Sequence, residues 1–424
     1  RGLLEGLRRA DPERVIRRIT VCEIDRRKYA ALARALLRLA RTDSDEQMEV
    51  IVDEAAAAAT SETGRGRGVP RPTATRASDP VYLLATLEPV SRAGYLSRTS
   101  LLTAGAKAAV LAGTVEVKVG ELQRQIGPLE QGEVTSRDMA RIGTALARSL
   151  LPPAVREGLA AMASRPLVVV HDREASRVPW EVLQIGATHP ALGAGLSRRY
   201  ASEALTVARW REEADRSGPL RLLLVVNPTG DLPGAAAEGE ALQQLFRQRA
   251  AVTCEVLEGP AATRARIVAA LGAGSHDVLH FAGHAFFDPA APASSGLLCA
   301  GREVLRSGDL AAITALPALV FCNACEAARV RRRARPGLRG TLTSVAEAFL
   351  ARGVANFMGT HWPVGDEAAF AFSRALYESL LQGDSLGAAI LAARRRIAAI
   401  PSVDWADYVH YGSHEFRLVD APDR

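Results

Sequence analysis

Two stretches decide how this chain folds: Val-Leu-His-Phe-Ala-Gly-His at residues 278–284, and Leu-Val-Phe-Cys-Asn-Ala-Cys at residues 319–325. Each begins as a short apolar run, which predicts a buried strand, and each ends in small residues followed by a reactive side chain, His284 or Cys325. In an open α/β sheet, ligands bind at the carboxyl ends of strands, so we expect both side chains at that edge. A cysteine beside a histidine that can accept its proton is the reactive pair of a cysteine hydrolase.

The same two residues also have a structural interpretation. A buried cysteine after a strand is usually part of the core, and a histidine in that place is often structural too. Finding both at neighbouring strand ends, each flanked by small residues, favours chemistry more than either does alone. Their separation of 41 residues is enough for a crossover between adjacent strands.

Strands and helices alternate through the second half of the chain. Apolar runs predict strands at 221–226, 252–257, 278–281, 318–321 and 354–358, with a hairpin between 297–300 and 303–305. Helical periodicity falls at 235–248, 263–271, 341–352, 366–382 and 385–398. This alternation predicts an α/β fold, in which a parallel sheet carries helices on both faces.

The first half of the chain divides into segments that differ in composition and in hydrophobic periodicity. Residues 1–60 keep helical spacing and predict a small helical domain, while 61–79 are rich in Gly, Arg, Pro and Thr and predict a linker. Residues 80–215 contain shorter predicted strands, at 81–87, 108–111, 114–119 and 167–171, and a helix at 138–150. We expect 80–215 to form a supporting part that packs on a catalytic half at 216–424.

Composition places the chain among globular proteins. Of 424 residues, 48% are hydrophobic, so a sizeable core can form. The net charge is +6, and arginine supplies nearly all of the positive charge. This preference for arginine is typical of a GC-rich genome, so the charge alone does not favour direct nucleic-acid binding. No apolar run approaches the roughly 20 residues of a membrane span, and no signal peptide is visible.

The cysteines fit a cytoplasmic protein without a metal site. Their number is five, an odd count that suits a reducing compartment. Cys322 and Cys325 form a single C-x-x-C, but zinc would need a second pair, and the surroundings do not resemble a thioredoxin-like unit. Cys322 is better interpreted as a strand residue. No Gly-rich segment carries the Lys-Ser/Thr of a phosphate-binding loop, so no cofactor is expected.

Attack by a cysteine on a carbonyl also requires donors for the oxyanion that forms. Gly283 has no side chain that would block a substrate, and its backbone N–H is one candidate donor. The N–H of Cys325, where a strand gives way to a turn, is the second.

His-Phe-Ala-Gly-His at 280–284 and Phe-Cys-Asn-Ala-Cys-Glu-Ala at 321–327 resemble the two catalytic motifs of CHAT-domain peptidases, which belong to the caspase-like clan that includes separase. The resemblance extends over roughly 130–415 through five further segments: Val-Pro-Trp-Glu at 178–181, Asn-Pro-Thr-Gly-Asp-Leu-Pro-Gly-Ala at 227–235, Gly-Val-Ala at 353–355, Trp-Pro-Val-Gly-Asp at 362–366, and Asp-Trp-Ala at 404–406 with Tyr411-Gly412. The family commonly has Ser or Ala before the final Ala-Cys, so Asn323 is a small departure.

The resemblance implies a caspase-like fold in which Cys325 is the nucleophile and His284 is the base. In separase-like members, an acidic residue in the loop after the next strand binds a basic side chain before the cut, and Asp366 occupies the matching place. A carboxylate there would favour Arg or Lys through charge-assisted hydrogen bonds. The alternative is that Asp366 caps the helix that follows it.

The arginine-rich run at 329–339 follows the nucleophile closely and has three interpretations. It is a solvated loop, a self-cleaved or regulatory loop, or a nucleic-acid contact. The last ranks lowest because aromatic residues are absent around it.

Together these features predict a cytoplasmic cysteine endopeptidase that cleaves after basic residues. The resemblance implies a regulated effector in bacterial defence or programmed cell death, with a protein substrate and an activating or sensor partner. Residues 1–60 are the candidate docking module for that partner, on position alone. The alternatives are a non-catalytic interaction scaffold with a caspase-like fold, and another hydrolase or acyltransferase that uses the same pair.

Overall fold

The computed structural model describes residues 79–419, except for 92, 104–110, 132–133, 202–218, 287–293, 314–315, 325–344 and 401–402. The chain divides into two units at Thr75/Arg76, and every described residue belongs to the second. The predicted helical domain at 1–60 and nearly all of the predicted linker at 61–79 therefore lie outside the described residues.

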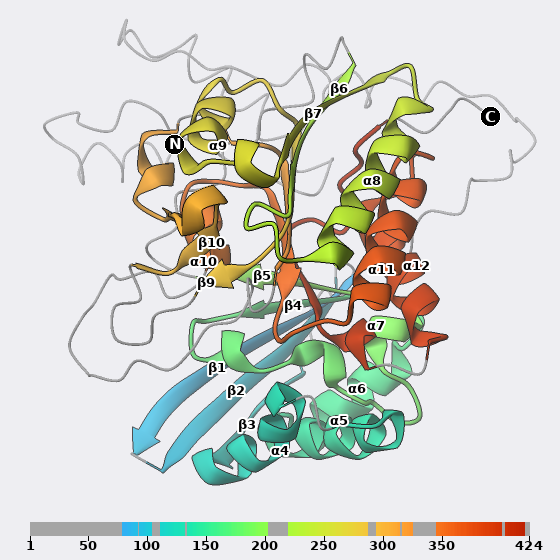
Figure 1. Ribbon diagram of the computed structural model, residues 1–424. Coiled ribbons are helices and arrows are strands. Elements are labelled where there is room, and N and C mark those ends of the chain that lie inside the picture. Colours follow the sequence, from blue (N-terminus) through green and yellow to red (C-terminus); the bar gives the residue numbers. More distant parts are fainter. Residues whose placement is uncertain are drawn as a thin grey trace, which may run out of the picture. The chain divides into compact units, whose positions relative to one another are not determined.

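The second unit is built on one sheet of eleven strands, in the order β3-β2-β1-β4-β5-β14-β13-β12-β8-β6-β7 (Figure 1). The strands of this sheet are β1 (Val81–Ser91), β2 (Gly94–Thr103), β3 (Leu111–Lys118), β4 (Leu167–His171), β5 (Leu196–Tyr200), β6 (Leu220–Val226), β7 (Val252–Glu258), β8 (Val278–Ala282), β12 (Leu319–Asn323), β13 (Asn356–Thr360) and β14 (Tyr408–Tyr411). A second sheet contains β9 (Ala285–Phe286), β10 (Gly296–Leu298) and β11 (Val304–Arg306).

Helices connect these strands. They are α4 (Val119–Gln131), α5 (Ser136–Leu150), α6 (Pro153–Ala161), α7 (Pro190–Gly193), α8 (Pro233–Arg247), α9 (Arg264–Gly272), α10 (Val345–Leu350), α11 (Asp366–Leu380) and α12 (Leu386–Ala398). Short 3-10 turns include η1 (Ala175–Arg177), η2 (Trp180–Val182) and η8 (Asp404–Ala406).

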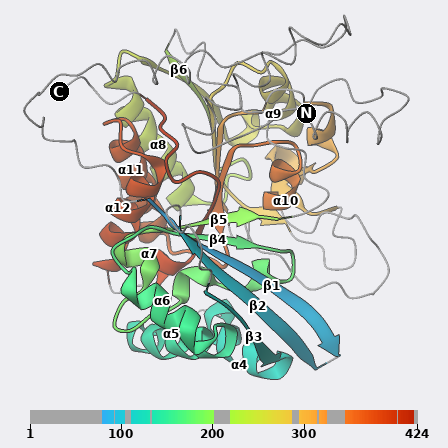
Figure 2. The same cartoon turned by 180° about the vertical axis from the view of Figure 1, so that it is seen from behind.

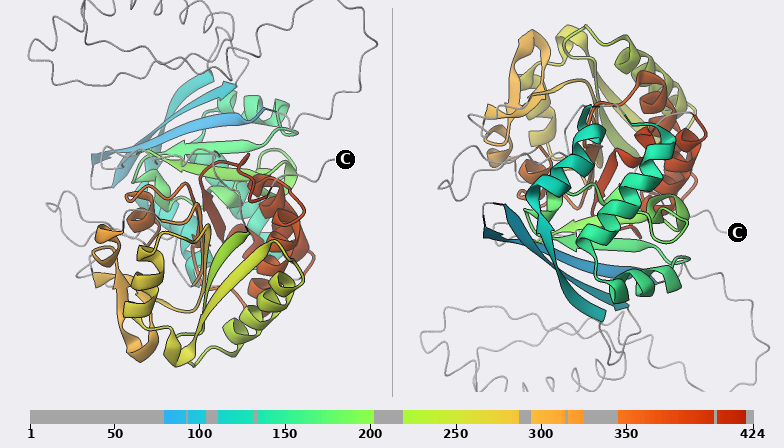
Figure 3. Two further views of the ribbon diagram at one scale, coloured as in Figure 1. Left: turned by 90° about the horizontal axis from the view of Figure 1, so that it is seen from above. Right: turned by 90° about the horizontal axis from the view of Figure 1, so that it is seen from below.

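Alternation along β6 shows why helices cover both faces of the sheet. Its side chains are almost all apolar, as expected of a strand buried on both sides. Leu222, Leu224 and Val226 belong to one apolar core, and Leu223 and Val225 belong to another. Figures 1 and 2 show α8, α11 and α12 on one side of β6 and α9 and α10 on the other, and the strands separate these two groups in Figure 3. The expected α/β fold with a mostly parallel sheet is confirmed.

The sheet is not parallel throughout. β1, β2 and β3 pair antiparallel, and β14 runs antiparallel to β13 but parallel to β5. The predicted hairpin is confirmed as β10 and β11. Strands β2, β5 and β14 and helices α4 and α6 were not predicted. Cross-strand pairing defines the three strands, and Pro128 interrupts the sequence pattern of α4.

The start of α5 shows a local sequence signal that the fold uses. Thr135 Oγ1 accepts a hydrogen bond from the Asp138 N–H at 3.4 Å, and the Asp138 carboxylate accepts one from the Thr135 N–H at 3.2 Å. This reciprocal pair satisfies two backbone donors at the helix terminus, and the Thr135 side chain lowers the pKa of the Asp138 carboxyl.

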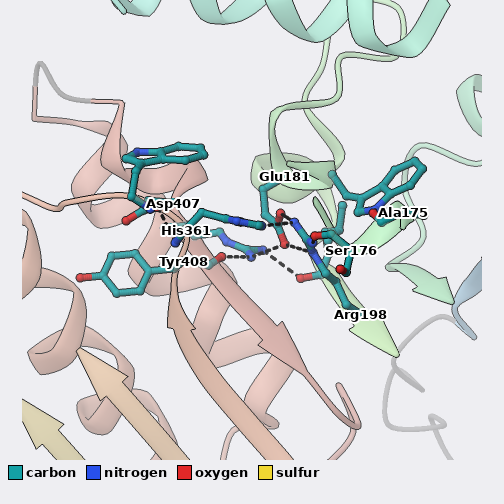
Figure 4. A network of polar contacts seen from close by, with 11 residues as sticks. Ala175, Ser176, Glu181, Arg198, His361, Asp407 and Tyr408 are labelled. Carbon is teal, nitrogen blue, oxygen red and sulfur yellow. Dashed lines mark hydrogen bonds and ion pairs between the residues drawn. The ribbon is translucent and has the colours of Figure 1, made fainter. Parts of the chain in front are cut away.

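A buried ion pair lies near the place where β5 pairs with β14 (Figure 4). Arg198 of β5 donates to both carboxylate oxygens of Glu181, with Nε 3.0 Å from Oε1, and to the Ser176 carbonyl at 3.2 Å. Its Nη2 also lies 3.0 Å from Nε2 of His361, in the loop that follows β13. Arg394 of α12 lies 3.8 Å from Glu181 and donates to the Leu196 and Tyr408 carbonyls. These fully buried charges link η2, β5, β14 and α12.

Asp407 extends this network to the loop after β13. One carboxylate oxygen accepts the N–H groups of His361 at 2.8 Å and Trp362 at 2.7 Å. Burial raises the pKa of Asp407 well above its ordinary value, although the two backbone donors oppose the shift. The contact fixes the backbone direction of the loop that leads to α11.

Replacing Arg198 with Met is expected to lower the free energy of unfolding by about 3–5 kcal/mol, because Glu181 would keep a buried charge without its principal partner. Urea unfolding measures this. The matched control is Arg374→Met, which removes the exposed pair with Glu378 and should cost less than about 1 kcal/mol. Equal losses in the two variants would contradict the role assigned to the buried pair.

Candidate active site

The carboxyl ends of β8 and β12 meet at one edge of the sheet. The two strands pair in parallel from Leu319 with Val278 to Asn323 with Ala282. His284 and Cys325 each follow the last of these pairs by two residues. Cys325 and the arginine-rich run at 329–339 lie outside the described residues, so the chain is described on this side as far as Ala324.

Gly283 occupies a tight position between the strand and His284. A Cβ at this residue would lie 2.9 Å from the Phe281 ring and 3.0 Å from Cδ of Pro228, so any larger residue would displace one of them. The Gly283 N–H, an expected oxyanion donor, donates to the Asn323 carbonyl at 3.3 Å. That hydrogen bond carries the strand pairing one step beyond Ala282.

His284 contacts a carboxylate that the sequence did not single out. Its Nε2 lies 3.1 Å from Oδ1 of Asp231, and both side chains are partly exposed. Asp231 also accepts a hydrogen bond from the Thr229 hydroxyl, and its other oxygen lies 3.7 Å from the Arg302 guanidinium. The Thr229 hydrogen bond and the contact with His284 lower the pKa of Asp231, so this carboxylate is ionised at neutral pH.

The loop at 227–235 is tied to the end of β8. The Asn227 N–H donates to the Ala282 carbonyl at 2.8 Å, and Asn227 has a left-handed backbone with φ of 42°. Its side-chain oxygen accepts the Leu232 N–H at 3.1 Å. Asparagine tolerates this conformation better than most residues, so the Asn-Pro-Thr-Gly turn directs Asp231 back towards His284.

A buried polar cluster lies beneath this edge of the sheet. Asn323 Nδ2 donates to both oxygens of Glu238 at 2.9 Å and lies 3.2 Å from the Ser373 hydroxyl. The Ser373 hydroxyl donates to Glu238, and the Tyr408 hydroxyl donates to the Asn323 amide oxygen at 3.2 Å. Asn323 thereby connects β12 to α8, α11 and β14.

The histidine at the start of the first motif is part of the same cluster. His280 is fully buried, with Nδ1 3.2 Å from the Tyr377 hydroxyl. Its Nε2 lies 3.1 Å from Glu238 Oε1, outside hydrogen-bonding geometry. His280 is therefore a core residue, whereas the histidine four positions later reaches the surface.

The described cysteines are not reactive thiols. Cys322 is fully buried in β12, as predicted for a strand residue, and burial raises its pKa. Burial also raises the pKa of Cys254 and of Cys299 to about 11. All three stay protonated at neutral pH.

Asp366 lies in the first turn of α11 and is exposed. The helix cap is Gly365, whose N–H lies 3.3 Å from the Asp404 carboxylate, so Asp366 is not the N-cap residue. A Cβ at Gly234 would collide with the Asp366 carboxylate, which therefore packs directly on Gly234. Gly234 lies in the first turn of α8, three residues after Asp231, so one short segment contacts both His284 and Asp366.

His361, the first residue of the loop after β13, is part of the core. It is 4% exposed, and its ring stacks on that of Trp362 with centroids 5.9 Å apart. Because Arg198 can only donate, the Nε2 of His361 is the acceptor of their 3.0 Å contact. The contact with the buried Arg198 holds His361 in the core. The sequence could not show this, because the two residues are far apart along the chain and meet only when it folds.

The CHAT domain matches residues 140–413 of this chain, which therefore belongs to the CHAT family. Two crystal structures of the Saccharomyces cerevisiae separase–securin complex, at 2.6 and 3.0 Å resolution, contain chains of similar fold. Their TM-scores are 0.55 and 0.53, with 12% and 13% sequence identity. Each alignment covers 78% of this chain and 30% of the other, so this chain spans under a third of the length of those neighbours. No curated protein matches it in sequence.

Two further findings concern metals and membranes. Among the described residues, no group of three or more His, Cys, Asp or Glu side chains is arranged to hold a metal ion. The helices at 79–419 include none that is long and apolar enough to cross a bilayer.

Replacing Asn323 should reveal how strongly the cluster depends on its amide. Asn323→Ala removes two donors from the buried Glu238 carboxylate and should lower the free energy of unfolding by about 1–3 kcal/mol. Asn323→Asp should be worse at pH 7.5, because two carboxylates would then face each other in the core.

The sign of the pH dependence follows from that repulsion. The pair of acids in Asn323→Asp would hold a proton in the folded state at a raised pKa, so its stability falls as pH rises through that pKa. The difference in unfolding temperature between Asn323→Asp and Asn323→Ala should therefore become smaller as the pH is lowered from 7.5 to 5. A constant gap would contradict the contact with Glu238.

Proposed function

We propose that this chain is a cysteine endopeptidase, in which Cys325 is the nucleophile and His284 is the general base. The observation that carries the proposal is the parallel pairing of Ala282 with Asn323. Because the two strands end side by side, His284 and Cys325 each come two residues after a paired strand end. The partly exposed His284 and membership of the CHAT family support the same assignment.

In this mechanism, His284 takes the proton of the Cys325 thiol as the sulfur attacks the peptide carbonyl. The tetrahedral oxyanion accepts hydrogen bonds from the N–H groups of Cys325 and Gly283. His284 then gives its proton to the leaving amine, and water hydrolyses the acyl-enzyme. The Gly283 N–H now donates to the Asn323 carbonyl at 3.3 Å, just beyond the usual length range, so its role requires exchange of that weak bond for the oxyanion.

Asp366 is the proposed recognition residue for a basic side chain before the cut. Its exposure leaves the carboxylate accessible, and its packing on Gly234 brings it to the loop that contacts His284. An ionised carboxylate here would bind Arg or Lys through charge-assisted hydrogen bonds.

The proposed biological role is that of a regulated cytoplasmic effector in bacterial defence or programmed cell death, acting on a protein substrate without a cofactor. The family resemblance supports this role. An activating or sensor protein would dock on residues 1–60, and the supporting part at 80–215 would hold the catalytic half at 216–424. The runner-up is a non-catalytic scaffold with the same fold.

Cleavage of a diverse peptide library, measured by mass spectrometry, tests the reaction. We expect Cys325→Ala and His284→Ala each to lower the cleavage rate at least about a thousandfold, because the pair acts as a unit. Cys322→Ala is the matched control and should keep its activity, since that thiol is buried in β12. Equal cleavage by wild type and Cys325→Ala would refute the nucleophile, and the absence of any cut would favour the scaffold.

The proposed recognition of basic side chains by Asp366 is tested separately. Asp366→Ala should lower kcat/KM for cleavage after Arg or Lys by roughly 10- to 100-fold, the loss of a charge-assisted hydrogen bond, with little effect at other cuts. Glu367→Ala removes the neighbouring exposed carboxylate and serves as the control. If Asp366→Ala cleaves after arginine as well as wild type does, Asp366 is not the recognition residue.

A further inference from the structure

We infer that Asp231 is a positioning residue for His284, which holds the Nε2–H of the imidazole and leaves Nδ1 free to take the thiol proton of Cys325. The inference rests on the proposed function and adds a third group to the proposed pair. Asp231 comes from the loop after β6, some fifty residues before His284, and no part of the catalytic motifs includes it.

The contact has the geometry of a charge-assisted hydrogen bond. Nε2 of His284 lies 3.1 Å from Oδ1 of Asp231, and a carboxylate can only accept. The proton of the neutral imidazole therefore resides on Nε2. Nδ1 then carries the lone pair, which is what a general base requires.

The carboxylate is itself held in place. The Thr229 hydroxyl donates to Oδ1, the Arg302 guanidinium lies 3.7 Å from Oδ2, and the Asn227 N–H ties the loop to the Ala282 carbonyl at 2.8 Å. Asp231 itself makes the first two contacts, and the third ties its loop to the end of β8. The loop that carries Asp231 is therefore held against the strand that leads to His284.

Charge makes the contact more favourable once the thiol proton has moved. The imidazolium that forms on His284 faces the ionised Asp231, and the two opposite charges attract. The side chains of His284 and Asp231 are 35% and 47% exposed, so water screens the attraction. We therefore expect a moderate effect, smaller than that of a buried aspartate in a serine hydrolase triad.

The reactivity of Cys325 towards iodoacetamide tests the inference without a known substrate. Alkylation needs the thiolate, so its rate in the full-length chain at pH 7 reports how readily His284 takes the proton. Peptide mass spectrometry follows Cys325 separately from Cys254 and Cys299, which react slowly because burial raises the pKa of each to about 11. The variants are His284→Ala, Asp231→Asn, Asp231→Glu and, as the control, Asp138→Asn.

We expect His284→Ala to slow alkylation of Cys325 most strongly and Asp231→Asn to slow it roughly tenfold, since the amide is neutral and can turn its NH₂ group towards the ring. Asp231→Glu should restore part of the rate because it keeps the charge. Asp138→Asn weakens the capping box of α5, far along the chain from His284, and should leave the rate unchanged.

The outcomes separate the two ideas. If His284→Ala alkylates as fast as wild type, His284 does not act on Cys325 and the proposed function fails together with the inference. If His284→Ala is slow but Asp231→Asn matches wild type, only the role of Asp231 is overturned. A rate in Asp231→Glu no better than in Asp231→Asn would also count against it, because the charge would then have no effect.

Discussion

The parallel pairing of β8 with β12 is the constraint on which the rest of the structure depends. Side chains alternate between the two faces of a strand, so a slip of one residue would turn every side chain of β12 to the opposite face. Val320 and Cys322 would then exchange cores with Leu319 and Phe321, which lie on the other side of the sheet. The register that keeps these side chains in their cores is also the one that aligns the end of β8 with the end of β12.

Polar contacts beneath the edge strengthen that register. Glu238 is 3% exposed, and burying a carboxylate is costly unless donors surround it. Asn323 supplies those donors only when β12 ends where it does, because its amide must reach α8 and α11 at once. Asn323, which departs from the usual family motif, thus has a structural role in this chain. Without its hydrogen bonds, the Glu238 carboxylate would be buried with too few donors, which would destabilise the fold.

The segment at 227–235 lies beside His284 and Asp366 at this edge of the sheet. It carries Asp231, which contacts His284, and Gly234, on which Asp366 packs, so one short segment touches both carboxylates. The buried Arg198–Glu181 pair acts at a greater distance. Through His361 and Asp407 it holds the loop that leads into α11, and therefore the carboxylate that begins that helix. The likeness to separase concerns the arrangement of strands and helices, at 12–13% identity, and these particular contacts belong to this chain.

The sequence by itself determined the elements with strong periodicity and the places where reactive residues follow strands. Strands such as β6 and β8 and helices such as α8, α11 and α12 could be predicted because their apolar spacing is local. The same is true of His284 after β8 and of Asp366 at the start of α11, whereas the role proposed for Asp366 came from the resemblance. Only the tertiary structure decided that β14 lies between β5 and β13, that Arg198 and His361 are buried together, and that Asp231 reaches His284. The two side-chain contacts join residues 53 and 163 positions apart. No local pattern encodes them, because their partners become neighbours only when the sheet has formed.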